Sequence, residues 1–218
     1  RSRYIVEDRI INTTKYNFNS TLNTAVTENI NFTAGVTYQS QNNHYYKEVD
    51  DLLGGEFYVD VNQFGERDFP ANPNAGQNDL NNPNRIVREG DKFGYNYDFN
   101  IKKGSVWLQG VFKFRKIDVF VATEHSYTSF FRKGNVKSGL FPNNSYGKSE
   151  TQNFYNSGIK GGLTYKINGR NYIFANASYA SRAPFFENAF IAPRTRDIVQ
   201  DNLKSEEILS TEVGYVMN

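Results

Sequence analysis

The sequence predicts an all-β fold of antiparallel strands that forms part of a large transmembrane barrel of the outer-membrane type, with long external loops. Polar and apolar residues alternate over about ten residues in several segments, which is the length that a tilted strand needs to cross a bilayer. Short turns alternate along the chain with much longer connections, as they do in such barrels. The segment 155–180 also contains Asn168-Gly169, the dipeptide that marks a β-hairpin most strongly.

The composition excludes several other classes of protein. Hydrophobic residues make up 38% of the 218 residues and the mean hydropathy is -0.66. No run approaches the roughly 20 apolar residues of a membrane helix. A barrel tolerates this low hydropathy because only alternate residues of each strand meet lipid. The net charge of +2 predicts no nucleic-acid partner, and the absence of cysteine excludes disulfides and thiol chemistry.

The first two predicted strands are Lys15–Val26 and Ile30–Ser40, joined by a short turn at 27–29. Both alternate with a period of two, and the polar set is rich in Asn, Thr and Gln, which suits a hydrated lumen. Both exceed the five or six residues of an average soluble strand. We expect one set to face lipid (Leu22, Phe32, Ala34 and Val36) and the other to face the lumen (Asn19, Asn23, Thr33 and Gly35).

A connection of some fifty residues is predicted from Gln41 to Lys92. It holds a possible helical turn at Lys47–Leu53, which Gly54-Gly55 would stop, and a short strand candidate at Glu56–Val61. Its Asp and Asn residues do not have the spacing of an EF-hand. The interpretation as a solvated loop is therefore preferred to calcium binding.

The segment Phe93–Phe114 is predicted to be extended, but its apolar residues change face part-way. The change falls at 102–104, and we expect a β-bulge there. A turn at this place would put the next long loop on the side of the short turns. The return strand is Val119–Phe131, whose facing is ambiguous, and a second long loop follows at Arg132–Asn153.

The hairpin around Asn168-Gly169 is expected to close with a two-residue type I′ turn. That turn fixes a register in which Tyr165 lies opposite Tyr172 and Leu163 lies opposite Phe174, with these four residues on one face. A third long loop at Arg182–Glu207 and a last strand at Ile208–Met217 complete a pattern of seven strands. Because bacterial single-chain barrels close with even numbers of strands, we expect an arc of a larger barrel.

The C-terminal third resembles the TonB-dependent outer-membrane receptors. Three segments carry the resemblance: SYASRAPFFENAF at 178–190, LKSEE at 203–207 and STEVGY at 210–215. The segment YYKEVDDLLGGEFYVDVNQFGERDF is also similar to an external loop of the carboxypeptidase-regulatory-like subgroup. The matching positions are Arg182, Pro184, Leu203, Glu206, Glu212, Gly214 and Tyr215.

The resemblance implies a barrel of about 22 strands in the bacterial outer membrane. Residues 1–218 would supply about seven strands of the wall, without a plug domain. The implied function is to bind and import a nutrient, such as a siderophore or a glycan. The implied partners are outer-membrane lipid, the nutrient, and the TonB complex acting through the plug domain. No catalytic activity, cofactor or metal is expected.

Two groups of residues are candidates for functional sites. Arg182, Glu206 and Glu212 are placed at or near the lumen wall, where they could contact the plug or the substrate path; the alternative is strand-end solvation or bonding between neighbouring strands. Loop aromatic residues could stack on a ligand or pack the loops on themselves. The predicted ligand-contacting residues are Tyr45, Tyr46, Tyr58, Phe64, Phe185 and Phe186, with Phe57 and Phe69 in the same loop cluster.

Two rival functions remain open at this point. A soluble β-sandwich module that binds carbohydrate would explain the Tyr and Asn content. An outer-membrane enzyme lacks a visible site, because the two histidines, His44 and His125, lie far apart and no Gly-x-Ser-x-Gly elbow is present.

Overall fold

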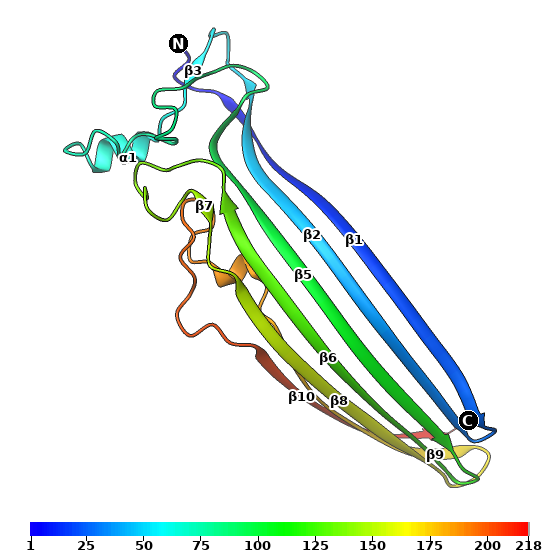
Figure 1. Cartoon of the computed structure of the whole chain (residues 1–218). Helices are drawn as coiled ribbons and strands as arrows, with labels where there is room; N and C mark the ends of the chain where they lie inside the picture. Colours follow the sequence, from blue (N-terminus) through cyan, green and yellow to red (C-terminus); the bar gives the residue numbers. More distant parts are fainter. Residues whose placement is uncertain (218) are drawn as a thin grey trace.

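Seven long strands form one continuous antiparallel sheet in the computed structural model, which describes residues 1–217 (Figure 1). The order across the sheet is β1-β2-β5-β6-β8-β9-β10, so neighbours in space are neighbours along the chain. The predicted all-β antiparallel fold is confirmed. The bounds are β1 Val6–Thr27, β2 Ile30–Asp51, β5 Lys92–Lys113, β6 Ile117–Gly134, β8 Gln152–Lys166, β9 Asn171–Arg182 and β10 Glu206–Met217.

Short elements lie in the long connections at one end of the sheet, which we call the loop end; the other end, with the tight turns, is the hairpin end (Figure 1). Asn62 caps the first turn of α1, because its side chain accepts hydrogen bonds from the backbone N–H groups of residues 64 and 65. The elements are β3 Tyr58–Val59, which pairs with β4 Ile86–Val87, α1 Gln63–Asp68, β7 Gly147–Lys148, which pairs with β6, and the 3-10 helix Phe186–Ala189.

The sheet has two chemically distinct faces, because side chains alternate along each strand. The inner face is the one on which the long loops pack, and it carries the odd positions of β1, β2 and β5 and the even positions of β6, β8, β9 and β10. Leu22 pairs with Ala34, and Ala34 pairs with Leu108, all on the outer face. The predicted division of the first two strands into two sets of side chains is therefore confirmed.

Strand β2 runs to Asp51, well beyond the predicted end at Ser40. The expected helical turn at Lys47–Leu53 is wrong. Residues 41–51 pair with β1 on one side and up to Glu48 with β5 on the other, which satisfies their backbone groups without a helix.

The expected β-bulge at 102–104 is also wrong, because β5 is continuous and its pairing with both neighbours is regular there. The change of apolar face in the sequence is real and has another cause. At the loop end the inner face is covered by loops, so Phe99 and Ile101 are buried there. Towards the hairpin end the apolar residues Val106 and Leu108 lie on the outer face and are exposed.

The hairpin between β8 and β9 closes one residue out of the expected register. Tyr165 pairs with Ile173, and Lys166 pairs with Tyr172. The Asn168 side chain accepts hydrogen bonds from the backbone N–H groups of Arg170 (2.9 Å) and Asn171 (3.0 Å). This Asx-type bonding supports a longer loop in place of the type I′ turn.

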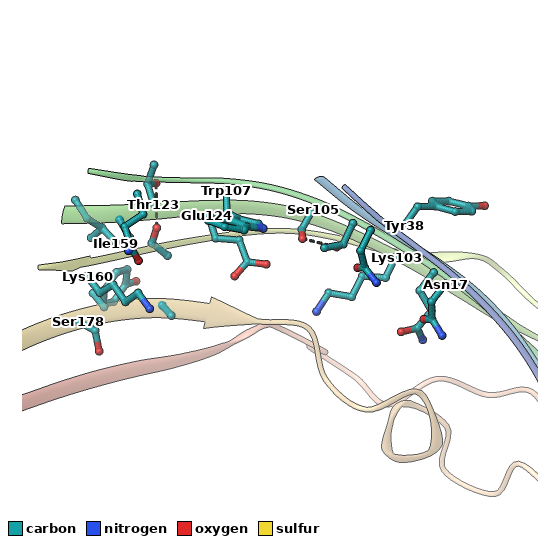
Figure 2. A pocket seen from close by; sticks show the side chains of 18 residues that line it. Asn17, Tyr38, Lys103, Ser105, Trp107, Thr123, Glu124, Ile159, Lys160 and Ser178 are labelled. Carbon is teal, nitrogen blue, oxygen red and sulfur yellow. Dashed lines mark hydrogen bonds between the residues drawn. The ribbon is translucent and has the colours of Figure 1, made fainter. Parts of the chain in front are cut away.

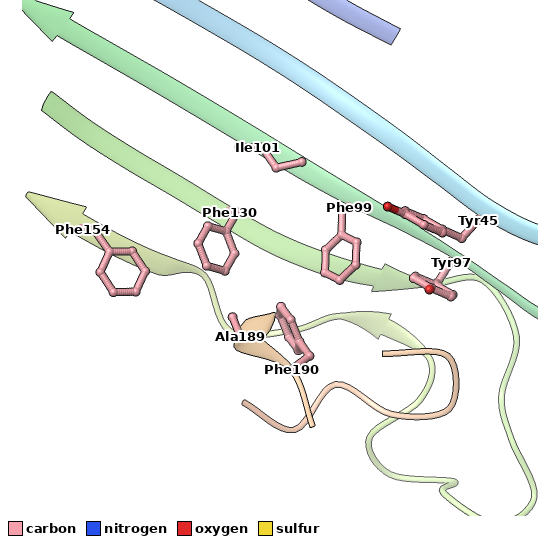
Figure 3. Packing of buried hydrophobic residues seen from close by; sticks show 8 residues of the cluster. All are labelled: Tyr45, Tyr97, Phe99, Ile101, Phe130, Phe154, Ala189 and Phe190. Carbon is pink, nitrogen blue, oxygen red and sulfur yellow. The ribbon is translucent and has the colours of Figure 1, made fainter. Parts of the chain in front are cut away.

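Two hydrophobic clusters join the loops to the inner face at the loop end. The larger one lies between β2, β5, β6 and β8 on one side and the loop 183–205 on the other (Figure 3). Phe99 is its centre, with ring centroids 4.9 Å from Phe186 and 5.4 Å from Phe190. The smaller cluster contains Val49, Leu52, Tyr58, Val87 and Phe93.

The loops 52–91, 135–151 and 183–205 are bonded to one another and form a unit that we call the cap. Backbone bonds join Leu80 to Lys137 (2.7 Å), Gly139 to Gln77 (2.8 Å) and Asp197 to Asn144 (2.7 Å). Asp60 organises the first loop as a buried carboxylate that accepts hydrogen bonds from Asn78, Arg85 and the backbone of Gly94. The cap thus covers the inner face at the loop end and leaves the hairpin half uncovered.

Candidate functional site

A hollow of about 730 Å³ lies on the inner face, between the cap and the hairpin end (Figure 2). Six strands contribute to it, mainly through the alternate residues that point inward. Figure 2 shows Lys103 and Glu124 pointing into this space, while Tyr38 lies on the other side of the sheet. The lining is amide, hydroxyl and charged, and includes Asn17, Asn19, Thr37, Gln39, Lys103, Ser105, Trp107, Gln109, Glu124, Lys160 and Ser178.

Trp107 is the largest side chain of this lining, and it lies against the backbone of its cross-strand partner Gly35. A Cβ atom at position 35 would stand 2.6 Å from the indole ring, closer than real Cβ atoms come to a neighbour. Glycine at 35 therefore lets the indole lie flat on the wall. Phe120 over Gly162 and Phe174 over Gly214 repeat the arrangement on the inner face.

Replacing Gly35 by valine should displace the indole of Trp107 into the hollow and shift its fluorescence emission to the red. The overpacking should also lower stability by about 1–3 kcal/mol. Trp107 is the one tryptophan of the chain, so the emission reports this site alone. Gly104→Val is the matched control, because a Cβ there meets its nearest atom at 3.9 Å. Identical spectra for both variants would contradict the contact.

A second space of about 550 Å³ connects this hollow to the cap. A ladder of side-chain hydrogen bonds borders it along β2, from Gln39 to Gln41 (3.0 Å) and from Gln41 to Asn43 (2.8 Å). Asn156 of β8 also lines it, is 4% exposed, and has no hydrogen-bond partner for either amide atom within the described residues. A buried amide without a protein partner is satisfied by water or by a ligand.

The predicted charged residues Arg182, Glu206 and Glu212 all lie on the inner face, near the far edge of the sheet. Arg182 and Glu206 form an ion pair with 2.6 Å between Nη2 and Oε2, and both side chains are more than half exposed. Glu212 accepts a hydrogen bond of 3.2 Å from Asn176 Nδ2. The bonds run between neighbouring strands; a role in plug or substrate contact stays a prediction.

The predicted ligand-contacting aromatic residues have different environments. Tyr45, Tyr58 and Phe186 pack in or against the two hydrophobic clusters. Tyr46 lies on the outer face, where Lys92 Nζ is 4.0 Å from its ring centroid. Phe64 and Phe185 are 67% and 63% exposed. Packing therefore accounts for the first three, whereas Phe64 and Phe185 are accessible to a ligand.

Two strand residues that are themselves buried, Tyr45 and Arg132, fasten the cap to the strands through polar contacts. The hydroxyl of Tyr45 donates a hydrogen bond to Glu187, and burial, helped by this bond, raises the pKa of Tyr45 to about 12. Arg132 is 2% exposed and donates from Nε to the Pro193 carbonyl (2.6 Å) and from Nη1 to the Ser145 carbonyl (3.0 Å). Burial lowers the pKa of Arg132, and the charge of Asp197 opposes that effect.

Sequence reasoning missed most of the residues that line the hollow. Lys103, Trp107, Glu124 and Lys160 share it because they occupy inward positions of three adjacent strands. The signal that identifies them is which alternate residues of β5 and β6 point inward. The predicted bulge exchanges the two faces in half of β5, and the sequence pattern does not assign the faces of β6.

Among residues 1–217, no group of three or more His, Asp or Glu residues could hold a metal ion. No helix in this part of the chain is long and apolar enough to cross a membrane. No protein-family model matches the chain, and no curated protein matches it.

Proposed function

We propose that residues 1–218 form part of the wall and the external loops of an outer-membrane TonB-dependent receptor that imports a nutrient. The wall holds the polar hollow on its lumen side and lipid on its outer side. The cap provides the first contact with the nutrient. Energy from TonB acts through a plug domain, which is a separate part of such receptors.

The observation that carries the proposal is the exposed apolar outer face. Large apolar side chains stand on it in all seven strands, with Leu22 68%, Leu209 76% and Val213 78% exposed. Soluble proteins rarely expose a continuous apolar patch of more than a few hundred Å². Further members are Phe18, Val36, Leu108, Val121, Ile159, Leu163, Ile173 and Met217.

The outer face also carries an aromatic row of the kind found at a membrane interface. Phe18 pairs with Tyr38, Tyr38 with Gly104, Gly104 with Tyr127, and Tyr127 with Tyr155. About ten residues of β6 separate this row from the hairpin end. At about 3.3 Å per residue and a strand tilt near 35° to the membrane normal, they span a height of roughly 27 Å. That height agrees with the apolar band of about 25 Å in such barrels. Tyr45 and Arg132 lie beyond this band, on the side of the cap.

The stagger of the hairpins supports a barrel wall. Ile30, beside the first turn, pairs with Phe112, and β5 runs on to Phe114 before the second turn. Ile117, beside that turn, pairs with Tyr165, and the chain runs on to Ile167 before the third. Each turn is therefore displaced by about two residues from the previous one, two strands away. A displacement of about one residue (3.3 Å) for each strand spacing (4.8 Å) corresponds to a strand tilt of about 35°. Strands in closed barrels tilt by about 35–45°.

The inner face and the sequence resemblance support the import of a nutrient. The hollow offers amides, hydroxyls and charges of both signs, with an indole and no tight enclosure, which suits the passage of a polar solute. The segments 178–190, 203–207 and 210–215 are those that resemble TonB-dependent receptors, and they contain the inward-facing Arg182, Glu206 and Glu212.

The proposal is tested by measuring lipid contact at single labelled positions. Residues 1–218 contain no cysteine, so a cysteine introduced among them can be labelled at a chosen site. Leu108→Cys and Gln109→Cys place single labels on opposite faces of β5, a strand in the interior of the sheet. In the full-length protein, reconstituted in vesicles, a fluorophore at 108 should be strongly quenched by lipids brominated on their acyl chains. The same fluorophore at 109 should be quenched weakly, because Gln109 lines the hollow.

The two labels control for each other, since they differ by one residue in position. Weak quenching at both would mean that the outer face meets water or protein. That outcome would favour a soluble carbohydrate-binding module and would reject the membrane wall.

A further inference from the structure

A separate cavity of about 430 Å³ lies at the loop end, between the first strands and the cap. Its volume falls within the range of about 300–1,000 Å³ typical of small-molecule sites. Four cations and one carboxylate line it: Arg9, Lys47, Arg132, Arg194 and Glu7. The carboxylate is occupied, because Glu7 binds Arg9 through Oε1 (2.9 Å) and Lys47 through Oε2 (2.6 Å).

Arg132 and Arg194 are the cations left for a ligand. Neither forms an ion pair with a carboxylate in the described part of the chain. Asp197 is the acidic group that acts on Arg132 electrostatically, and burial raises the pKa of this carboxyl group. The site therefore has an excess of positive charge, because four cations face two carboxylates, Glu7 and Asp197.

Aromatic rings hold these cations in place. The guanidinium carbon of Arg194 is 5.5 Å from the ring centroid of Tyr95, and that of Arg132 is 4.9 Å from Tyr97. Lys47 Nζ approaches Tyr95 at 5.8 Å, and the two tyrosine rings are 5.8 Å apart. Cations from three distant segments thus gather around two neighbouring rings, which partly offset their mutual repulsion.

The guanidinium of Arg132 is fixed in place and keeps one nitrogen for a ligand. Its hydrogen bonds to the Pro193 and Ser145 carbonyls use Nε and Nη1 and fix the plane of the group, so Nη2 is the nitrogen without a hydrogen-bond partner in the described part of the chain. A carboxylate or a sulfate can accept a charge-assisted hydrogen bond from Nη2. Phe64, 67% exposed, also lines the cavity; the guanidinium carbon of Arg67 lies 5.2 Å from its ring centroid, and the exposed part of the ring offers an aromatic surface to a sugar ring.

We infer that this cavity binds an acidic saccharide, through a carboxylate or sulfate group held by Arg132 and Arg194, with a sugar ring on Phe64. This inference goes beyond the proposed function, since neither the import of a nutrient nor the lipid-facing wall requires an anion. It also stands apart from the predicted residues of the lumen wall, which lie elsewhere on the sheet.

Calorimetry on the full-length protein in detergent tests the inference with three probes. Digalacturonate carries carboxylates, a sulfated chondroitin disaccharide carries a sulfate, and cellobiose is neutral. We expect at least one charged probe to bind, with an affinity that falls as salt rises, and cellobiose not to bind. Comparison of the two charged probes identifies the anionic group.

Arg194→Ala should weaken that binding at least tenfold, and Arg194→Lys should weaken it less. Arg170→Ala removes the same charge from an exposed position at the hairpin end and should leave binding unchanged. Failure of both charged probes to bind, equal binding of cellobiose, or full affinity in Arg194→Ala would each overturn the inference. Because the protein is in detergent, these results do not depend on lipid contact, which the brominated-lipid experiment decides.

Discussion

Arginine at position 34 should lower the stability of the full-length protein in membranes by roughly 2–4 kcal/mol, the penalty for a basic residue on the lipid face near the bilayer centre. Ala34 lies on the outer face between Leu22 and Leu108, near the middle of the apolar band. The guanidinium would have to leave water or distort the bilayer around it. Urea unfolding of protein folded into vesicles measures the loss.

Thr33→Arg is the matched control, one residue away on the inner face. Thr33 accepts one exposed hydrogen bond, from Asn23 (3.1 Å), and its replacement by arginine should have little effect in a hydrated lumen. If both arginines were tolerated equally, the outer face would not meet lipid, and the proposal of a membrane wall would be rejected.

Removal of the Phe99 ring should release the loop 183–205 from the sheet. Phe99 is 0% exposed and contacts the rings of Tyr45, Phe186 and Phe190. A Phe→Ala change in such a core lowers stability by about 3–5 kcal/mol. Because this cluster holds the buried apolar residues of the loop 183–205, whereas the second cluster holds the loop 52–91, we expect the loss to appear as local opening of the loop 183–205.

Hydrogen exchange measures this opening at the Ile191 amide, which donates to the Ile198 carbonyl at 3.0 Å. Exchange there should become at least a hundredfold faster in Phe99→Ala, since each 1.4 kcal/mol is a factor of ten. Phe112→Ala, on the outer face of the same strand, should leave it unchanged. Unchanged exchange in both variants would show that the cap does not depend on this cluster.

The sequence predicted the strands best where both faces have a constant environment. In the hairpin half of β1 and β2, one face is apolar and the other polar, so the alternation of Leu22 with Asn23 is easy to read. Beyond Ser40 the pattern of Asn42, Asn43, His44, Tyr45 and Tyr46 loses its period, because the cap covers the inner face there. The strand was therefore predicted to end too early.

The candidate site depended on contacts that no local pattern contains. Tyr45 bonds to Glu187 across 142 positions, and Arg132 bonds to Pro193 across 61. The Asn168-Gly169 signal gave the right hairpin and the wrong register, because the Asn168 side chain competes for backbone N–H groups. Arg182, Glu206 and Glu212 share the inner face because they end or lie in strongly alternating strands, whereas their position at a lumen wall stays a prediction.

The unequal strand lengths determine how a large solute would approach the proposed wall. β1, β2 and β5 each have 22 residues, whereas β9 and β10 have 12. With the hairpin ends level (Figure 1), ten residues at about 3.3 Å each and a tilt near 35° make one flank roughly 27 Å taller than the other. The rim therefore slopes. The tall side, formed by β1, β2 and β5, would block the approach of a bulky solute. The solute would enter over the low side, formed by β9 and β10, where the loop 183–205 obstructs the entrance.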